Sequence, residues 1–256
     1  MGFSNESNLE NFAFSIDKTD QRLINHISNL IFENSDSDID CPNFCKYYSV
    51  DDFLKRKFNN KKYFSMFHLN THSLQAHKSD LDILLDELKF EFDVIAISES
   101  RLLKGIEPTH NIEIPNYKIE HTPTEANKGG TLLYISENYE HKLRKDLEVY
   151  ESKKIESTFV EILRPNNQNI IIGCIYKHHT ISKKDFNEIM ENLISKISKE
   201  KKICYLAGDF NMDLLCLHKD SEIEKHFDNF TSNNFMPLIT YPTRIAKTSK
   251  TYFQSI

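Results

Sequence analysis

Apolar and polar residues follow one another in a pattern that predicts short strands and amphipathic helices in turn. From Tyr63 onward, apolar runs of strand length alternate with segments whose apolar residues recur at helical spacing. The predicted strands are 63–69, 93–98, 117–120, 131–136, 158–163, 169–176, 203–207, 236–239 and 251–256. The predicted helices begin at Ser79, at Ser182 and at Glu222. Because these strands are too many for one open sheet of usual size, the pattern predicts a β-sandwich flanked by helices.

The first 60 residues have a different pattern. Two short amphipathic helices are predicted on either side of an acidic, polar stretch, the second over 48–58 with Ser49 or Asp51 as its cap. We therefore predict an N-terminal appendage over 1–60, partly disordered at its start, followed by one domain over 61–256.

Charge and composition limit the possible classes of protein. The chain of 256 residues has a net charge of −6, so bulk charge does not hold it to nucleic acid. Binding of DNA would need a local basic rim or a divalent metal. No apolar run approaches the ~20 residues of a membrane helix, and the N-terminus lacks the layout of a signal peptide. We expect an intracellular protein, not a secreted one, with no membrane partner and with its five cysteines as thiols.

One apolar run ends in a polar cluster that can carry chemistry. Residues 203–207 lead to Gly208, and Asp209 and Asn211 follow. These two side chains lie on the same side of an extended chain because they are two positions apart. A carboxylate that orients a water, beside an amide that donates to an anionic oxygen, suits hydrolysis of a phosphate ester. The alternative is an ordinary turn at the end of a strand.

Other predicted strands also end at polar residues. Asn70 and Glu99 each follow a strand, and Tyr176 ends one. Converging strand ends commonly form sites in α/β folds. Glu99, helped by Asn70, suits a hard cation such as Mg²⁺, which needs only one or two protein carboxylates. The metal would neutralise the phosphate while Asp209 positions or deprotonates a water. Each residue alone could be a turn former, a cap or a core edge, but their joint placement favours a site.

Six short motifs lie in a fixed order along residues 63–256. They are 67–74 (FHLNTHSL), 93–99 (DVIAISE), 128–134 (KGGTLLY), 175–176 (IY), 208–211 (GDFN) and 242–244 (PTR). In this order the chain resembles the endonuclease/exonuclease/phosphatase superfamily, and most narrowly the endonuclease domain of non-LTR retrotransposons, relatives of the apurinic/apyrimidinic endonucleases. The resemblance implies a four-layer α/β sandwich of two mixed β-sheets flanked by helices.

The resemblance also implies a function, with roles for single residues. The activity would be a DNA endonuclease that depends on Mg²⁺ or Mn²⁺ and nicks target DNA for retrotransposition. The residues implied in catalysis are Asp209, Asn211, Tyr176 and Asn70. Those implied at the metal are Glu99 and Asn70, and those implied in substrate binding are Thr251 and Arg244. The implied partners are DNA and a downstream reverse transcriptase of a longer polyprotein, with a nuclear location if the protein is active.

Two departures from the family pattern lower the expected activity. Gln254 stands where the family has an Asp that hydrogen-bonds the catalytic histidine, and a neutral amide does not stabilise an imidazolium as a carboxylate does. The family's Ser-Asp-His motif and the last strand of one sheet lie beyond Ile256. His218 and His226 fall in a predicted helical region, so we do not expect them to replace that histidine. We expect weak or absent cleavage by the chain as it stands.

Two alternatives to this function remain open. The first is another phosphoesterase of the same superfamily, acting on a lipid or inositol phosphate. A membrane anchor or a phosphoinositide-type basic cluster would favour it, and the sequence shows neither. The second is a non-enzymatic remnant or binding module that holds nucleic acid or a partner.

Overall fold

The computed structural model describes residues 47–56, 63–239, 243–246 and 249–251. All of them belong to one compact unit, Asn43–Ile256. Three predictions lie outside the described residues: the first helix of the N-terminal segment, the part of the strand beyond Thr251, and the role of Gln254. The division of the chain at residue 60 stays a prediction.

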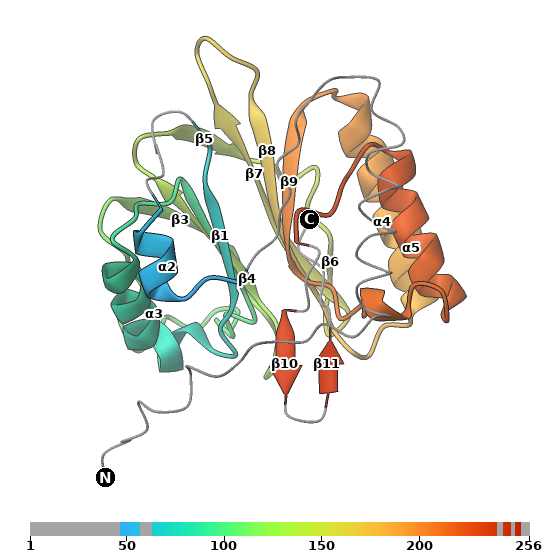
Figure 1. The fold of residues 1–256 in the computed structure, drawn as a ribbon, viewed down its shortest axis with the longest axis horizontal. Coiled ribbons are helices and arrows are strands. Elements are labelled where there is room, and N and C mark those ends of the chain that lie inside the picture. Colours follow the sequence, from blue (N-terminus) through green and yellow to red (C-terminus); the bar gives the residue numbers. More distant parts are fainter. Residues whose placement is uncertain (1–46, 57–62, 240–242, 247–248, 252–256) are drawn as a thin grey trace. The chain divides into compact units, whose positions relative to one another are not determined.

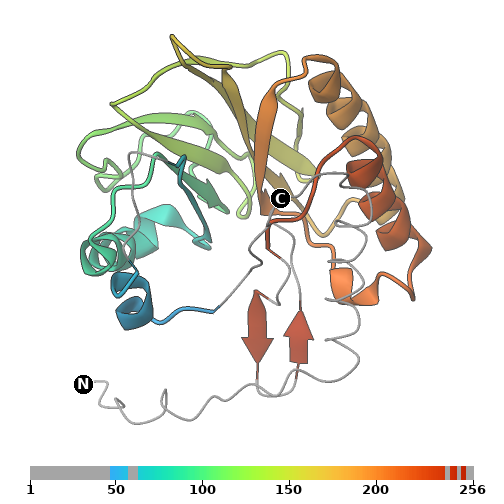
Figure 2. The same ribbon diagram turned by 45° about the horizontal axis from the view of Figure 1, so that its top comes forward.

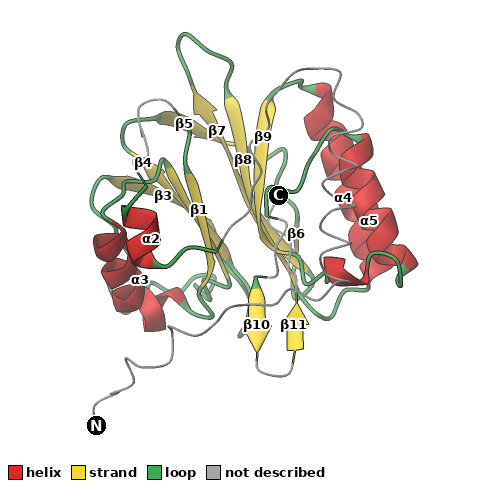
Figure 3. Cartoon of the chain, in the orientation of Figure 1, coloured by secondary structure: helices red, strands yellow, loops and turns green. Residues whose placement is uncertain are grey.

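Two mixed β-sheets form the centre of the fold (Figures 1 and 3). The first has the order β1 (Met66–Asn70), β2 (Val94–Ser98), β4 (Thr131–Ser136) and β3 (Tyr117–Thr122). The second has the order β5 (Glu140–Leu143), β7 (Ile155–Leu163), β8 (Ile170–Lys177) and β9 (Ile203–Asp209), with β6 (Tyr150–Glu151) paired to β7. The pairs β1–β2 and β8–β9 are parallel, and the other pairs within these two sheets are antiparallel.

Helices lie on the outer faces of both sheets. The helices are α2 (Val50–Leu54), α3 (Leu74–Leu88), α4 (Lys183–Lys199) and α5 (Ser221–Ser232), with a 3₁₀ turn η1 (Leu214–Cys216) before α5. Figures 1 and 2 both show α4 and α5 side by side, on the opposite side of the two sheets from α2 and α3. A short antiparallel hairpin of β10 (Arg244–Ala246) and β11 (Ser249–Thr251) follows. Within the described part of the chain, no helix has both the length and the apolar character needed to cross a membrane.

The alternation of side chains along β2 explains why the sheet is covered on both faces. Val94 and Ala96 pack in a core that also contains residues of β7, β8 and β9, whereas Ile95 and Ile97 pack with leucines of α3. Successive residues of a strand point to opposite faces, so a continuous apolar run is buried on both sides. The layers are therefore helix, sheet, sheet and helix. This confirms the predicted α/β sandwich of two mixed sheets.

Several element boundaries differ from the prediction. The helix predicted to begin at Ser79 begins at Leu74, because Ser73 is its N-cap and accepts a hydrogen bond from the Ala76 amide at 3.4 Å. The predicted strand 236–239 is wrong, since these residues have no strand pairing. The edge strand β5 was not predicted, because its sequence Glu-His-Lys-Leu has no apolar run. Charged edge strands of this kind protect a sheet from pairing with other chains.

The helix predicted over 48–58 is observed as the shorter α2. Ser49 is its N-cap, and its hydroxyl accepts a hydrogen bond from the Asp52 amide at 3.1 Å. Phe53 packs edge-to-face on Phe90, with the ring centroids 5.7 Å apart. This short helix is therefore attached to the core beneath the first sheet rather than standing free of it.

A buried ionic cluster fastens one end of the second sheet. The Glu161 carboxylate, 1% exposed, accepts hydrogen bonds from Arg144 Nη1 at 2.7 Å, from Lys202 Nζ at 2.8 Å and from Asn169 Nδ2 at 2.8 Å. Arg144 also pairs with Glu200 at the end of α4. Burial raises the pKa of Glu161, but the hydrogen bonds from Lys202, Asn169, Lys142 and Arg144 together outweigh it and lower the pKa to about 2. The cluster thus joins the start of β9 and the end of α4 to β7.

Replacing Glu161 with glutamine is expected to lower the free energy of unfolding at pH 7 by about 3 kcal/mol, because the buried Arg144 and the partly buried Lys202 lose the anion between them. The folded pKa of Glu161 lies below its ordinary value of 4.5. Its contribution is therefore present above pH 4.5 and lost as the pH falls from there towards 2. Urea unfolding at pH 7, 4 and 3 measures this. The control Glu140→Gln, on an exposed edge residue, is expected within about 0.5 kcal/mol of the parent. If the free energy of unfolding depended on pH equally in the parent and in Glu161→Gln, the charged Glu161 carboxylate would not be the source of this stability.

Candidate active site

The carboxyl ends of two parallel strand pairs, one from each sheet, meet at one place. In the first sheet β1 and β2 pair in parallel up to Asn70 opposite Ser98, and Glu99 follows directly. In the second sheet β8 and β9 pair in parallel with Tyr176 opposite Asp209. The hydroxyl of Tyr176 donates to Glu99 Oε1 at 2.9 Å, and Asn70 Nδ2 donates to Asp209 Oδ2 at 2.7 Å. Two hydrogen bonds between the sheets therefore bring the predicted site residues together.

Glu99 is the centre of this group and is only 4% exposed. Its Oε1 accepts from Tyr176 and, at 3.5 Å, from Asn70 Nδ2. Its Oε2 lies 3.1 Å from His72 Nδ1 and 3.2 Å from Arg101 Nη2. Burial raises the pKa of Glu99, but the hydrogen bonds from Tyr176 and Arg101 outweigh it and hold the pKa below its ordinary value. Glu99 is therefore a carboxylate that keeps its charge although it is buried.

Asp209 is set to accept a proton. Its Oδ2 is held by Asn70, and its Oδ1 accepts a hydrogen bond from the Asn211 backbone amide at 3.0 Å. Burial raises the pKa of Asp209, against the lowering effect of the Asn211 hydrogen bond. The Asn211 side chain donates to the Lys177 carbonyl at 2.6 Å, which ties the loop after β9 to the end of β8. Two neighbouring carboxylates whose pKa values are shifted in opposite directions are typical of acid–base sites.

These groups line a pocket of about 470 Å³. Its lining residues are His68, Leu69, Asn70, His72, Glu99, His179, Gly208, Asp209, Asn211, Ile239 and Thr243. Tyr176 is buried beneath it, with its hydroxyl on Glu99. His72 and His179 are pocket residues for which no role was predicted; His72 lies within the motif 67–74, and His179 follows the motif 175–176. Their place in the pocket was not visible without the backbone.

The two residues implied in substrate binding are described only by their backbone. Arg244 begins β10 and pairs with Thr251, which ends β11. Thr243, the residue before Arg244, lines the pocket, so the motif at 242–244 reaches the site. The roles of Arg244 and Thr251 stay predictions.

His226 lies away from this site, as the sequence indicated. It is fully buried on α5, with its ring stacked on Phe186 and its Nδ1 3.0 Å from Asn187 Oδ1. It is a core residue of the layer formed by α4 and α5, and it does not line the pocket.

The donor atoms at the pocket fit a hard divalent cation that keeps most of its waters. In the part of the chain that the structure describes, no group of three His, Cys, Asp or Glu side chains could hold a metal ion. A cation at Glu99 would have one carboxylate, and Mg²⁺ commonly binds proteins through only one or two carboxylates. Asn70 presents its Nδ2, which donates to Glu99, so its amide would have to turn over to offer its oxygen to the ion. The charged state of the buried Glu99 suits such an ion.

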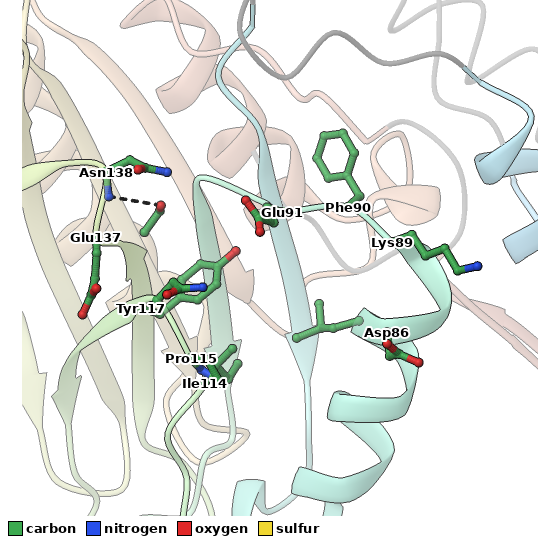
Figure 4. A pocket seen from close by; sticks show the side chains of 12 residues that line it. Asp86, Lys89, Phe90, Glu91, Ile114, Pro115, Tyr117, Glu137 and Asn138 are labelled. Atoms are coloured by element: carbon green, nitrogen blue, oxygen red, sulfur yellow. Dashed lines mark hydrogen bonds between the residues drawn. The ribbon is translucent and has the colours of Figure 1, made fainter.

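A second cavity, of about 720 Å³, lies at the opposite end of the strands of the first sheet, where β3 begins and β4 ends (Figure 4). Asp86, Glu91 and Glu137 line it together with one cation, Lys89. Three carboxylates against one ammonium have the wrong sign for a phosphate.

Comparison with solved structures supports the fold, whereas comparisons of sequence find no relative. No protein-family model matches the chain, and a search of curated proteins finds no match. The endonuclease domain of TRAS1, a telomere-specific non-LTR retrotransposon, is similar over 76% of this chain and 82% of its own, with 13% identity and a TM-score of 0.52. The AP endonuclease LMAP from Leishmania major is similar over 81% and 78%, with 13% identity and a TM-score of 0.53. The Xenopus laevis APE2 catalytic domain is similar over 75% and 81%, with 11% identity and a TM-score of 0.50.

The described chain has the endonuclease/exonuclease/phosphatase fold. The resemblance drawn from six short motifs is confirmed at this level. At sequence identities of 11–13% the structural similarity establishes only the fold, so the chemistry has to be argued from the site residues.

Proposed function

We propose that the chain is a divalent-metal-dependent phosphodiesterase that nicks DNA. The observation that carries this proposal is the single hydrogen-bonded group formed by Glu99, Asn70 and Asp209 at the joined strand ends of both sheets. Asn70 contacts a carboxylate that keeps its charge on one side and a proton-accepting carboxylate on the other. This arrangement suits a cation and a water held next to one phosphate.

Glu99 and Asn70 are the residues that would hold Mg²⁺ or Mn²⁺. Bound there, the ion supplies neutralisation of the phosphate and of the leaving oxygen. Tyr176 fixes the Glu99 carboxylate by its hydrogen bond. Asp209, held at both oxygens by Asn70 and by the Asn211 amide, orients a water and takes its proton during attack on phosphorus.

Other residues are proposed to bind the substrate. The Asn211 side chain, which lines the pocket, would face the phosphate, and Tyr176 would act through its hydrogen bond to Glu99. Arg244 and Thr251 would contact the DNA strand near the motif that reaches the pocket. The overall charge of −6 makes a metal at the site important for holding an anionic substrate.

The proposed biological setting is the nicking of target DNA for retrotransposition. The likeness to the TRAS1 endonuclease domain supports this setting. A downstream reverse transcriptase as partner and a nuclear location belong to the same proposal. A low rate is part of the proposal, because Gln254 stands in place of the expected Asp.

Nicking of supercoiled plasmid tests the proposal, with Mg²⁺, with Mn²⁺ and with EDTA. We expect slow, metal-dependent formation of open circles that EDTA stops and that Glu99→Gln removes. A substrate panel containing an abasic duplex and inositol phosphates compares the classes of phosphate ester. If the protein hydrolysed inositol phosphates faster than it cleaved the abasic duplex, we would conclude that its substrate is an inositol phosphate and not DNA. No turnover of any substrate, with a folded protein that still binds DNA across a salt series, would show a binding module instead.

A further inference from the structure

We propose that His72 is a metal ligand that, together with Glu99, makes this site prefer a first-row transition-metal ion to Mg²⁺. The inference rests on the metal position proposed above. It adds a nitrogen ligand that the sequence motifs do not assign, and with it a preference among cations.

The spacing of two atoms carries the inference. His72 Nδ1 lies 3.1 Å from Glu99 Oε2. Two adjacent ligand atoms on an octahedral cation, each about 2.1 Å from the ion, are about 3 Å apart. The same spacing serves a hydrogen bond when no ion is bound, so neither side chain has to move far to change partner. Arg101, which also contacts Oε2, has only N–H donors and cannot ligate an ion.

The backbone holds both ligands in place before an ion arrives. The Thr71 amide donates to the Ser98 carbonyl at 3.1 Å, and the Leu74 amide donates to the Ser100 carbonyl at 2.9 Å. The segment that carries His72 is therefore joined on both sides to the segment that carries Glu99. Both ligands are thus presented by one hydrogen-bonded pair of loops.

Strain in the same two loops points to a site rather than to an ordinary turn. His72 has φ 51° and Glu99 has φ 51°, a region that residues other than glycine rarely adopt. Such strain collects at ligand sites, where the surrounding structure over-determines it. The left-handed turn leaves the His72 ring 67% exposed beside the pocket, where a cation can reach it from solvent.

The chemistry of the pair decides which ion fits. Mg²⁺ takes oxygen ligands and releases its waters reluctantly, whereas imidazole nitrogen suits transition-metal ions. A carboxylate alone would favour Mg²⁺. A carboxylate with an imidazole beside it should favour Co²⁺ or Mn²⁺ over Mg²⁺, with Co²⁺ ahead of Mn²⁺ in the usual order of affinities.

Calorimetric titration of the substrate-free protein with CoCl₂ and with MgCl₂ tests the inference without any activity assay. His72→Gly removes the imidazole, and glycine accepts the positive φ without strain. We expect it to weaken Co²⁺ binding by about tenfold or more, the size typical of changes at metal sites, and Mg²⁺ binding by less than about twofold. The matched control is His77→Ala, because His77 makes a similar pair with Asp80, Nδ1 to Oδ2 3.0 Å, outside the pocket. It should change neither affinity.

A ligand swap gives a second, independent result. His72→Asp keeps a ligand at this position and tolerates the positive φ, but the ligand atom becomes oxygen instead of nitrogen. The ratio of Co²⁺ affinity to Mg²⁺ affinity should therefore fall, while Mg²⁺ binding is kept or strengthened. An unchanged ratio in both His72 variants, with Co²⁺ binding lost in Glu99→Gln, would refute the role of His72 and leave the metal position intact. Binding unaffected by Glu99→Gln would refute the metal position itself. Thermal melting by circular dichroism confirms that each variant is folded.

Discussion

Asp209→Asn is expected to reduce metal-dependent nicking by at least about 10²-fold, because removal of a general base commonly costs 10² to 10⁴ in rate. The variant keeps the shape of the side chain but only one of its two hydrogen bonds, because its single carbonyl oxygen can accept from Asn70 or from the Asn211 backbone amide and not from both. It cannot take a proton from water. Metal binding, which depends on Glu99, should remain.

The stability of this variant separates a catalytic role from a structural one. Burial disfavours the charged form of Asp209, and relief of that cost in the neutral variant offsets the loss of one accepted hydrogen bond, so the melting temperature should change little. Asp228→Asn, on the exposed face of α5, is the matched control for the loss of one negative charge. Single-turnover nicking of supercoiled plasmid gives the rates. Nicking by Asp209→Asn at the rate of the control would show that the base lies elsewhere.

The parts of the fold that follow from local pattern could be read from the sequence. The residues of β2 and β4 form continuous apolar runs because each strand is covered on both faces, and β4 has the predicted bounds 131–136. The start of α3 depends on Ser73, a cap with φ 138° that no periodic pattern reveals. The edge strand β5 is held by pairing with β7 rather than by apolar residues of its own.

For the site, too, the local features could be predicted from the sequence and the long-range contacts could not. Polar residues at strand ends indicated Asn70, Glu99 and Asp209 because the end of a strand is a local feature. Their connections were not predictable, since the bond from Asn70 to Asp209 joins residues 139 positions apart in two different sheets. His72 was missed for a related reason. Its contact with Glu99 depends on a left-handed turn at His72, which no periodic pattern in the sequence reveals.

Gly208 links the stability of the sandwich to the position of Asp209. It has φ 144°, and it pairs with Ile175 on β8 immediately before Asp209. A Cβ at this position would lie 1.8 Å from the Ile175 carbonyl oxygen, which real Cβ atoms essentially never approach so closely. β8 is held between β7 and β9, so it is the edge strand β9 that has to move. Any side chain here must push β9 away from β8 at the site itself.

Gly208→Ala is therefore expected to lower the free energy of unfolding by about 2–5 kcal/mol, the sum of about 1–3 for overpacking and about 1–2 for backbone strain. Gly105→Ala isolates the second contribution, because Gly105 has φ +73° with no atom within 4 Å of an added Cβ, and it should cost only about 1–2 kcal/mol. Urea unfolding measures both. Equal costs would mean that β8 and β9 separate easily. In that case the distance between Tyr176 and Asp209 could not be fixed by strand pairing, and the site would need another source of rigidity.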